Sequence, residues 1–127
     1  MHLLATKPGT VADGTEPIDL DQSPGDIVVL SAADTDLAAL ADARARRGPG
    51  GPSLRLANWL QLSHNLSVDL YVERVIDRAR LVVLRILGGP GYWPYGVEQL
   101  RQSAERTGAM LAVLPGDGRP DPALDAL

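Results

Sequence analysis

Apolar residues gather in three short runs along the chain, and each run predicts a β-strand. The runs are Ile27–Leu30, Leu81–Leu87 and Met110–Leu114. Short apolar runs rich in β-branched residues are typical of strands that are buried on both faces. Residues 2–6 form a further candidate for a short strand, which the following Pro8 and Gly9 would end.

Between these runs, apolar residues recur at the spacing of amphipathic helices. The first predicted helix follows the candidate N-caps Ser31 and Asp34 and stops at Gly48, with arginines in its last turn. The second begins at the N-cap Ser67 and is closed by Arg78 and Arg80. The third has its apolar face on Val97, Leu100, Ala104 and Thr107 and ends at Gly108.

The stretch Leu54–Leu62 is ambiguous. Leu54 to Leu56 alternate as in a strand, whereas Ser53 is a suitable cap for a short helix, and we expect helix from Ala57. The Gly- and Pro-rich residues 48–52 and the polar, acidic residues 10–25 are predicted to be loops.

The order strand, helix, helix, strand, helix, strand predicts a parallel sheet joined by right-handed crossovers. The expected fold class is α/β: a small three-layer domain with a parallel sheet and flanking helices, of flavodoxin- or Rossmann-like type. A length of 127 residues is typical of one domain. We therefore expect residues 1–127 to form a single α/β domain.

Composition narrows the classes of function. The net charge of −4 argues against a nucleic-acid partner or an anionic membrane surface. The absence of cysteine excludes disulfides, thiolate metal sites and thiol catalysis, and two histidines are too few to predict a zinc site. No apolar run reaches the roughly 20 residues of a membrane span, and no signal peptide is recognisable, so a cytoplasmic location is expected. A P-loop motif is absent, and the glycine-rich stretch after Leu87 does not match a dinucleotide fingerprint.

Three segments should meet at the edge formed by the carboxyl ends of the strands, where open α/β sheets bind ligands. They are residues 31–34, 88–95 and 115–119. Gly88 and Gly89 would let the main chain approach a ligand closely. Three of the five Trp and Tyr residues of the chain follow within the same segment: Tyr92, Trp93 and Tyr95. Such a loop suits a planar ligand or a protein partner, and it equally suits an aromatic cap that closes the end of the sheet.

Two further residues are candidates for chemistry. Arg85 interrupts a buried strand, so it either points off the edge of the sheet or pairs with a carboxylate, for which Asp69 and Asp117 are candidates. It could instead receive an anionic group of a substrate, and the structural pair is favoured. His64 precedes the Ser67 cap, where a structural hydrogen bond is favoured over a role as ligand or proton carrier.

The sequence resembles the CobN family, the large subunits of the aerobic, ATP-dependent cobaltochelatases of cobalamin biosynthesis. The resemblance lies in Ser53–Asn58, His64–Glu73 and Leu87–Gly96, and the turn Leu114–Asp117 fits as well. That family is similar in turn to the large subunit of magnesium chelatase. The resemblance covers nearly the whole chain and implies the amino-terminal end of a much longer subunit. The chain would then be an excised fragment or a truncated product.

The resemblance implies a ligase that inserts cobalt(II) into a corrin, hydrogenobyrinic acid a,c-diamide. ATP would be hydrolysed on a separate AAA+ motor subunit, with a third, adaptor subunit between the two. The large subunit would hold the corrin, and this chain would contribute to tetrapyrrole binding, bind no cofactor by itself and be inactive alone. Its partners would be the remainder of the large subunit, the motor and adaptor subunits and the corrin.

Carried over to this sequence, the resemblance makes five residues candidates for contact with the corrin or with the rest of the subunit: Gly88, Gly89, Tyr92, Trp93 and Tyr95. His64 and Asp69 are weaker candidates for positioning the metal or protons. No metal ligand is assigned.

Corrin contact predicts that the three aromatic side chains are largely exposed and face a cleft. A non-catalytic docking domain would instead show a broad exposed apolar patch and no pocket at the strand ends. A free-standing flavodoxin-like module would bind a mononucleotide at Ser31–Asp34.

Overall fold

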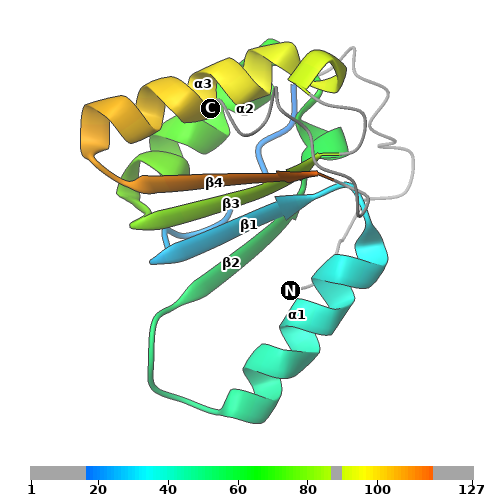
Figure 1. The fold of residues 1–127 in the computed structure, drawn as a ribbon, viewed down its shortest axis with the longest axis vertical. Coiled ribbons are helices and arrows are strands. Elements are labelled where there is room, and N and C mark those ends of the chain that lie inside the picture. The colour runs from blue at the N-terminus through cyan, green and yellow to red at the C-terminus, as the bar shows by residue number, and fades with distance from the viewer. Residues whose placement is uncertain (1–16, 87–89, 116–127) are drawn as a thin grey trace.

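The computed structural model describes residues 17–86 and 90–115, which form a four-stranded sheet between two layers of helices (Figure 1). Short 3₁₀ helices are labelled η. In chain order the elements are β1 (Ile27–Ser31), α1 (Asp34–Arg47), β2 (Leu54–Asn58), η1 (Trp59–Leu62), α2 (Asn65–Arg74), η2 (Ile76–Arg78), β3 (Leu81–Ile86), η3 (Pro90–Tyr92), α3 (Pro94–Thr107) and β4 (Met110–Pro115). The predicted three-layer α/β class is confirmed. Within the described residues no helix is long and apolar enough to cross a membrane.

All strands of the sheet are parallel, in the order β2-β1-β3-β4. Val29 lies opposite Leu56 on one side and Val83 on the other, and Val83 lies opposite Ala112. The direction in which the chain crosses the sheet reverses between the neighbours β1 and β3. In open α/β sheets the carboxyl ends of two such strands flank the crevice in which ligands bind.

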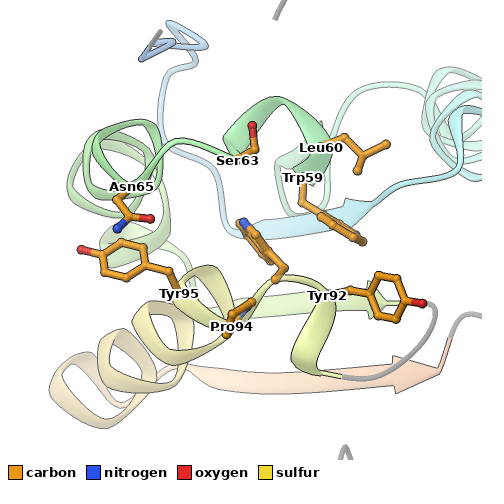
Figure 2. A pocket seen from close by; sticks show the side chains of 8 residues that line it. Trp59, Leu60, Ser63, Asn65, Tyr92, Pro94 and Tyr95 are labelled. Carbon is orange, nitrogen blue, oxygen red and sulfur yellow. The ribbon is translucent and has the colours of Figure 1, made fainter. Parts of the chain in front are cut away.

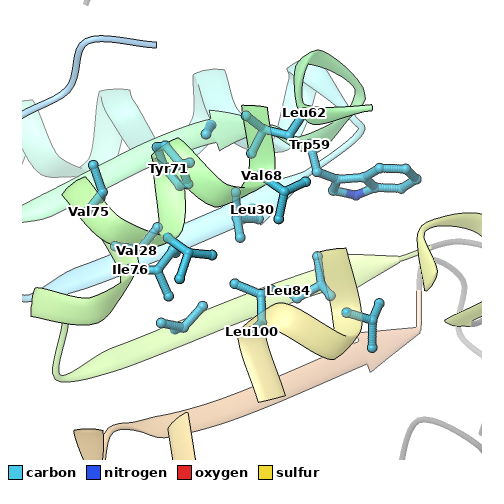
Figure 3. Packing of buried hydrophobic residues seen from close by; sticks show 14 of the residues in the cluster. Val28, Leu30, Trp59, Leu62, Val68, Tyr71, Val75, Ile76, Leu84 and Leu100 are labelled. Carbon is cyan, nitrogen blue, oxygen red and sulfur yellow. The ribbon is translucent and has the colours of Figure 1, made fainter. Parts of the chain in front are cut away.

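The two faces of the sheet carry different layers (Figure 1). Helices α2 and α3 cover one face, and among the described residues α1 is the one helix on the other. On the first face, Leu30 and Leu84 are fully buried against Val68 of α2 and Leu100 of α3 (Figure 3). The hydrophobic core therefore lies between the sheet and the α2–α3 layer.

The stretch Leu54–Leu62 differs from its prediction. Leu54–Asn58 is the edge strand β2, so the helix expected from Ala57 is wrong, and only the single turn η1 follows. The strand forms because pairing with β1 satisfies the main-chain groups of one side. Asn58 then ends it, since its side-chain oxygen accepts a hydrogen bond from the main-chain N–H of Leu60 at 2.9 Å.

Helix α2 begins at Asn65, and its N-cap is His64 rather than Ser67. The Nδ1 atom of His64 accepts a hydrogen bond from the main-chain N–H of Leu66 at 3.1 Å. Ser67 is buried, and its hydroxyl accepts a hydrogen bond from the main-chain N–H of Ile18 at 2.7 Å. The helix ends at Arg74, so the arginines expected to close it lie after it.

Helix α1 also begins differently from its prediction, because Ala33 is its N-cap and no side chain caps it. The predicted stops at Gly48 and Gly108 are confirmed, since both have the positive φ that glycine accepts readily. The candidate strand over residues 2–6 lies outside the described residues.

Candidate ligand-binding site at the carboxyl edge of the sheet

A hollow of about 290 Å³ opens at the carboxyl edge of the sheet (Figure 2). It lies between the segment that follows β2 and the segment that follows β3. Its lining residues are Trp59, Leu60, Ser63, Asn65, Tyr92, Trp93, Pro94 and Tyr95. The aromatic loop predicted to reach this edge therefore does line a concavity.

Two stacked indoles form the buried side of the hollow. The ring centroids of Trp59 and Trp93 are 5.5 Å apart, with 21° between the ring planes. The indole N–H of Trp59 donates to the carbonyl oxygen of Arg85 at 3.0 Å, and that of Trp93 donates to the carbonyl oxygen of Leu62 at 2.9 Å. Both rings are thus fixed by packing and by a hydrogen bond.

Trp93 is only 5% exposed, so the prediction that it is largely exposed is wrong. Its ring fills the space between η1 and the start of α3, and burial there demands a partner for its N–H. Gly96 makes this position possible, because a Cβ atom on Gly96 would lie 2.0 Å from the Trp93 ring. With Pro94 at the first turn of α3, the sequence from Trp93 to Gly96 seats the indole against the helix start.

The other two aromatic residues of the loop differ in their surroundings. Tyr92 is 71% exposed, as predicted, and Leu60 across the hollow is 56% exposed. Tyr95 is half-buried, so the prediction that it is largely exposed is wrong as well, and its hydroxyl donates to Asp69 Oδ1 at 2.6 Å. The hydrogen bond to Asp69 raises the pKa of Tyr95, with smaller contributions from burial and from the negative charge. The hydrogen bond between Tyr95 and Asp69 holds the start of α3 against α2.

Arg85 lies on the opposite face of the sheet from the hollow. Its guanidinium pairs with Asp36 of α1 at 2.6 Å, so Asp69 is wrong as its predicted partner, and Asp117 lies outside the described residues. Asp36 also accepts a hydrogen bond from the hydroxyl of Ser31 at 2.9 Å. The hydrogen bonds from Arg85 and Ser31 lower the pKa of Asp36. The structural pair that the sequence favoured for Arg85 is thus present, with another carboxylate.

The remaining candidates lie beside the hollow or outside the described residues. His64 caps α2, next to Asn65 of the hollow, and Asp69 is engaged by Tyr95. Gly88 and Gly89 lie outside the described residues. Among the residues that the structure describes, no three His, Asp or Glu side chains lie close enough together to hold a metal ion.

Four lining residues were not predicted, because they precede or begin α2 in a stretch without a clear pattern: Trp59, Leu60, Ser63 and Asn65. The one available signal was Trp59, which is one of only two tryptophans in a chain with few aromatic residues.

The fold and the hollow define a class: a flavodoxin-like α/β domain with a largely aromatic hollow at the carboxyl edge of its sheet. Comparison with known proteins then shows which proteins the chain is similar to. The chain is 52% identical over 98% of its length to the aerobic cobaltochelatase subunit CobN of Sinorhizobium sp. It is 51% identical over its full length to the protein of the same name from Pseudomonas aeruginosa.

The chain is therefore similar to CobN subunits over the segment that it spans, as its motifs predict. It spans about a tenth of the length of these curated relatives. No family model matches the chain, and no solved structure matches it significantly.

Proposed function

We propose that this chain is a domain of a cobaltochelatase CobN subunit and that its aromatic hollow contacts the corrin substrate during cobalt insertion in cobalamin biosynthesis. The observation that carries the proposal is the pairing of a fixed tryptophan stack with two exposed apolar side chains, Tyr92 and Leu60. A site that is formed before the ligand arrives loses little conformational entropy on binding. The names of the relatives support a role in cobalt chelation, and the corrin as ligand is what the family resemblance implies.

The size of the hollow limits the contact. Pockets that enclose a drug-sized ligand measure about 300–1,000 Å³, and this hollow of about 290 Å³ lies at the lower end. A corrin with its amide and carboxylate side chains is larger than that. In our proposal the hollow contacts one edge of the ring, and other parts of the subunit enclose the rest.

The lining of the hollow offers the two kinds of contact that the edge of a corrin ring needs. Tyr92 and Leu60 present apolar surface to the ring or its methyl groups, while the exposed Ser63 and Asn65 offer hydrogen bonds to peripheral amides and carboxylates. Tyr95 closes the side next to α2.

The larger reaction is part of the same proposal. Cobalt(II) and hydrogenobyrinic acid a,c-diamide are the substrates of a cytoplasmic ligase, and ATP is hydrolysed on a separate AAA+ motor subunit that acts through an adaptor. His64 and Asp69 remain weaker candidates for positioning the metal or protons, and Gly88 and Gly89 remain candidates for corrin contact.

Titration of the chain with hydrogenobyrinic acid a,c-diamide, followed by the absorbance of the corrin, tests the proposal. Tyr92→Ala and Leu60→Ala are each expected to raise Kd about 5- to 10-fold, because each removes about 1 kcal/mol of apolar contact. Leu114→Ala is the matched control, since Leu114 is similarly exposed at 47% but lies on β4, outside the hollow.

Two results would contradict corrin contact. One is the absence of binding by a chain that circular dichroism shows to be folded. The other is a Kd in Tyr92→Ala and Leu60→Ala that equals the value in Leu114→Ala. Trp93 is unsuited to this test, because its removal would disturb packing as well as contact.

A further inference from the structure

The sheet carries an apolar surface on the side away from α2 and α3, along the inner strand β3 and the edge strand β4. Within the described part of the chain, Met110 is 72% exposed and Leu114 47% exposed. Leu81, Val83 and Ala112 beside them are only half-buried. We call these five residues the open face.

Strand geometry places the open face on one side of the sheet. Leu81 lies opposite Met110, and Val83 lies opposite Ala112. Side chains alternate along a strand, and Leu111 and Val113 pack against the core on the other side. Helix α1 shares the side of the open face, but it packs on β1 and β2 and buries none of its own residues (Figure 1).

An open face is unusual for this kind of sheet. Parallel sheets occur almost only with both faces covered, and an exposed apolar patch typically marks an interface. The outer edge of β4 adds to this surface, because β4 is the last strand of the sheet and its outward main-chain groups have no neighbouring strand among the described residues. The face and the edge form one continuous surface.

The handedness of the connections limits what can cover the open face. Helix α3 connects β3 outward to β4 and lies on the same side as α2. Because crossovers are right-handed, a helix leading from β4 to a strand farther out would again lie on the α3 side. The cover of the open face is therefore not the helix of such a crossover.

We propose that another segment of the CobN subunit covers the open face, with an amphipathic helix placed beside α1 and main-chain pairing along the outer edge of β4. The length of the relatives carries the choice of occupant. The aligned region is 10% of their length, so in these relatives about nine-tenths of the subunit lies outside the region that this chain matches. The proposal is independent of corrin contact, because the hollow lies at the carboxyl edge and on other elements.

A photo-crosslinking amino acid at position 110 of the full-length subunit that carries this segment tests the proposal. Met110 is well exposed, so the substitution leaves the core intact. We expect a crosslink within one polypeptide, to a peptide outside the region matched by residues 1–127, identified by mass spectrometry. The same amino acid at Glu105, whose side chain is 68% exposed on α3, is the control and is expected to give different peptides or none.

Three outcomes would overturn the proposal. They are a crosslinked product with the mass of a dimer, crosslinks only to residues 1–16 or 116–127, and no crosslink at position 110. A second measurement uses Met110→Cys, the only cysteine that the segment would then contain. Its reaction with a maleimide should be at least about tenfold slower in the full-length subunit than in the 127-residue chain. Equal rates would show that the open face stays uncovered.

Discussion

The two faces of the sheet differ in burial although both are apolar in sequence. Along β3, Leu84 is fully buried beneath α3, whereas its neighbour Val83 is half-buried on the side of α1. Every turn of α1 keeps contact with solvent, while α2 and α3 bury residues along their length. The apolar pattern along a strand thus shows that both of its faces are suited to burial. It does not show that the same segment contains the layer that buries each face.

Truncating one leucine on each face should give the largest difference in the free energy of unfolding. Leu84→Ala leaves a cavity at a fully buried position and should cost about 2–5 kcal/mol in the free energy of unfolding. Leu114→Ala on the open face should change it by no more than about 0.5 kcal/mol. Urea unfolding of both variants measures the difference, and equal losses would mean that the open face is covered in the chain itself.

Gly96→Ala should have the next largest effect, because it acts where the packed face meets the hollow. The new Cβ atom would collide with the Trp93 ring, so the variant should lose about 1–3 kcal/mol despite the better helix propensity of alanine. Gly91→Ala is the control, since a Cβ atom there meets nothing within 4 Å. Thermal unfolding measures the stability of both variants. A Gly96→Ala variant as stable as Gly91→Ala would refute the close packing of Gly96 against Trp93.

The N-cap of α2 should contribute less to the free energy of unfolding than the packing at Gly96. His64→Ala removes the acceptor for the N–H of Leu66 and should cost about 1 kcal/mol, whereas His64→Asn keeps an acceptor and should cost less than half of that. Chemical denaturation compares the two variants. Equal losses would contradict the capping role. A loss of chelation in the full-length subunit with His64→Asn, at unchanged stability, would indicate a role in metal or proton positioning.

The ion pair between Asp36 and Arg85 should give the smallest effect, visible as a dependence on pH. The pKa of Asp36 is lowered in the folded chain, so its stabilising contribution is present above the ordinary carboxyl pKa and is lost as the pH falls below about 4. Asp36→Asn should make stability less sensitive to acid between pH 2 and 7. Asp42→Asn, in an exposed pair with Arg46 on the same helix, should change the acid transition less.

The strands and helix stops of this fold were predictable because local patterns set them. The apolar runs and the glycines Gly48 and Gly108 each act within a few residues. Strand β2 stayed ambiguous in the sequence because the alternation of Leu54 to Leu56 is short. The strand is completed by pairing with β1, which a local pattern does not record.

The site was predictable only in outline. The clustering of Tyr92, Trp93 and Tyr95 indicated the right edge of the sheet, but the burial of Trp93 depends on Trp59, which comes from another segment. The partner of Arg85 was likewise set by tertiary structure, since α1 brings Asp36 to it across 49 positions of sequence.

The stack of Trp59 on Trp93 contains every tryptophan of the chain. All tryptophan emission, and any coupled indole signal in the near-ultraviolet circular dichroism, therefore originates at one end of the sheet. The chain has an intrinsic optical reporter for the hollow and none for the open face. A change confined to β4 would leave this spectrum unaltered, so the two surfaces can be followed separately in one sample once a second label is placed at position 110.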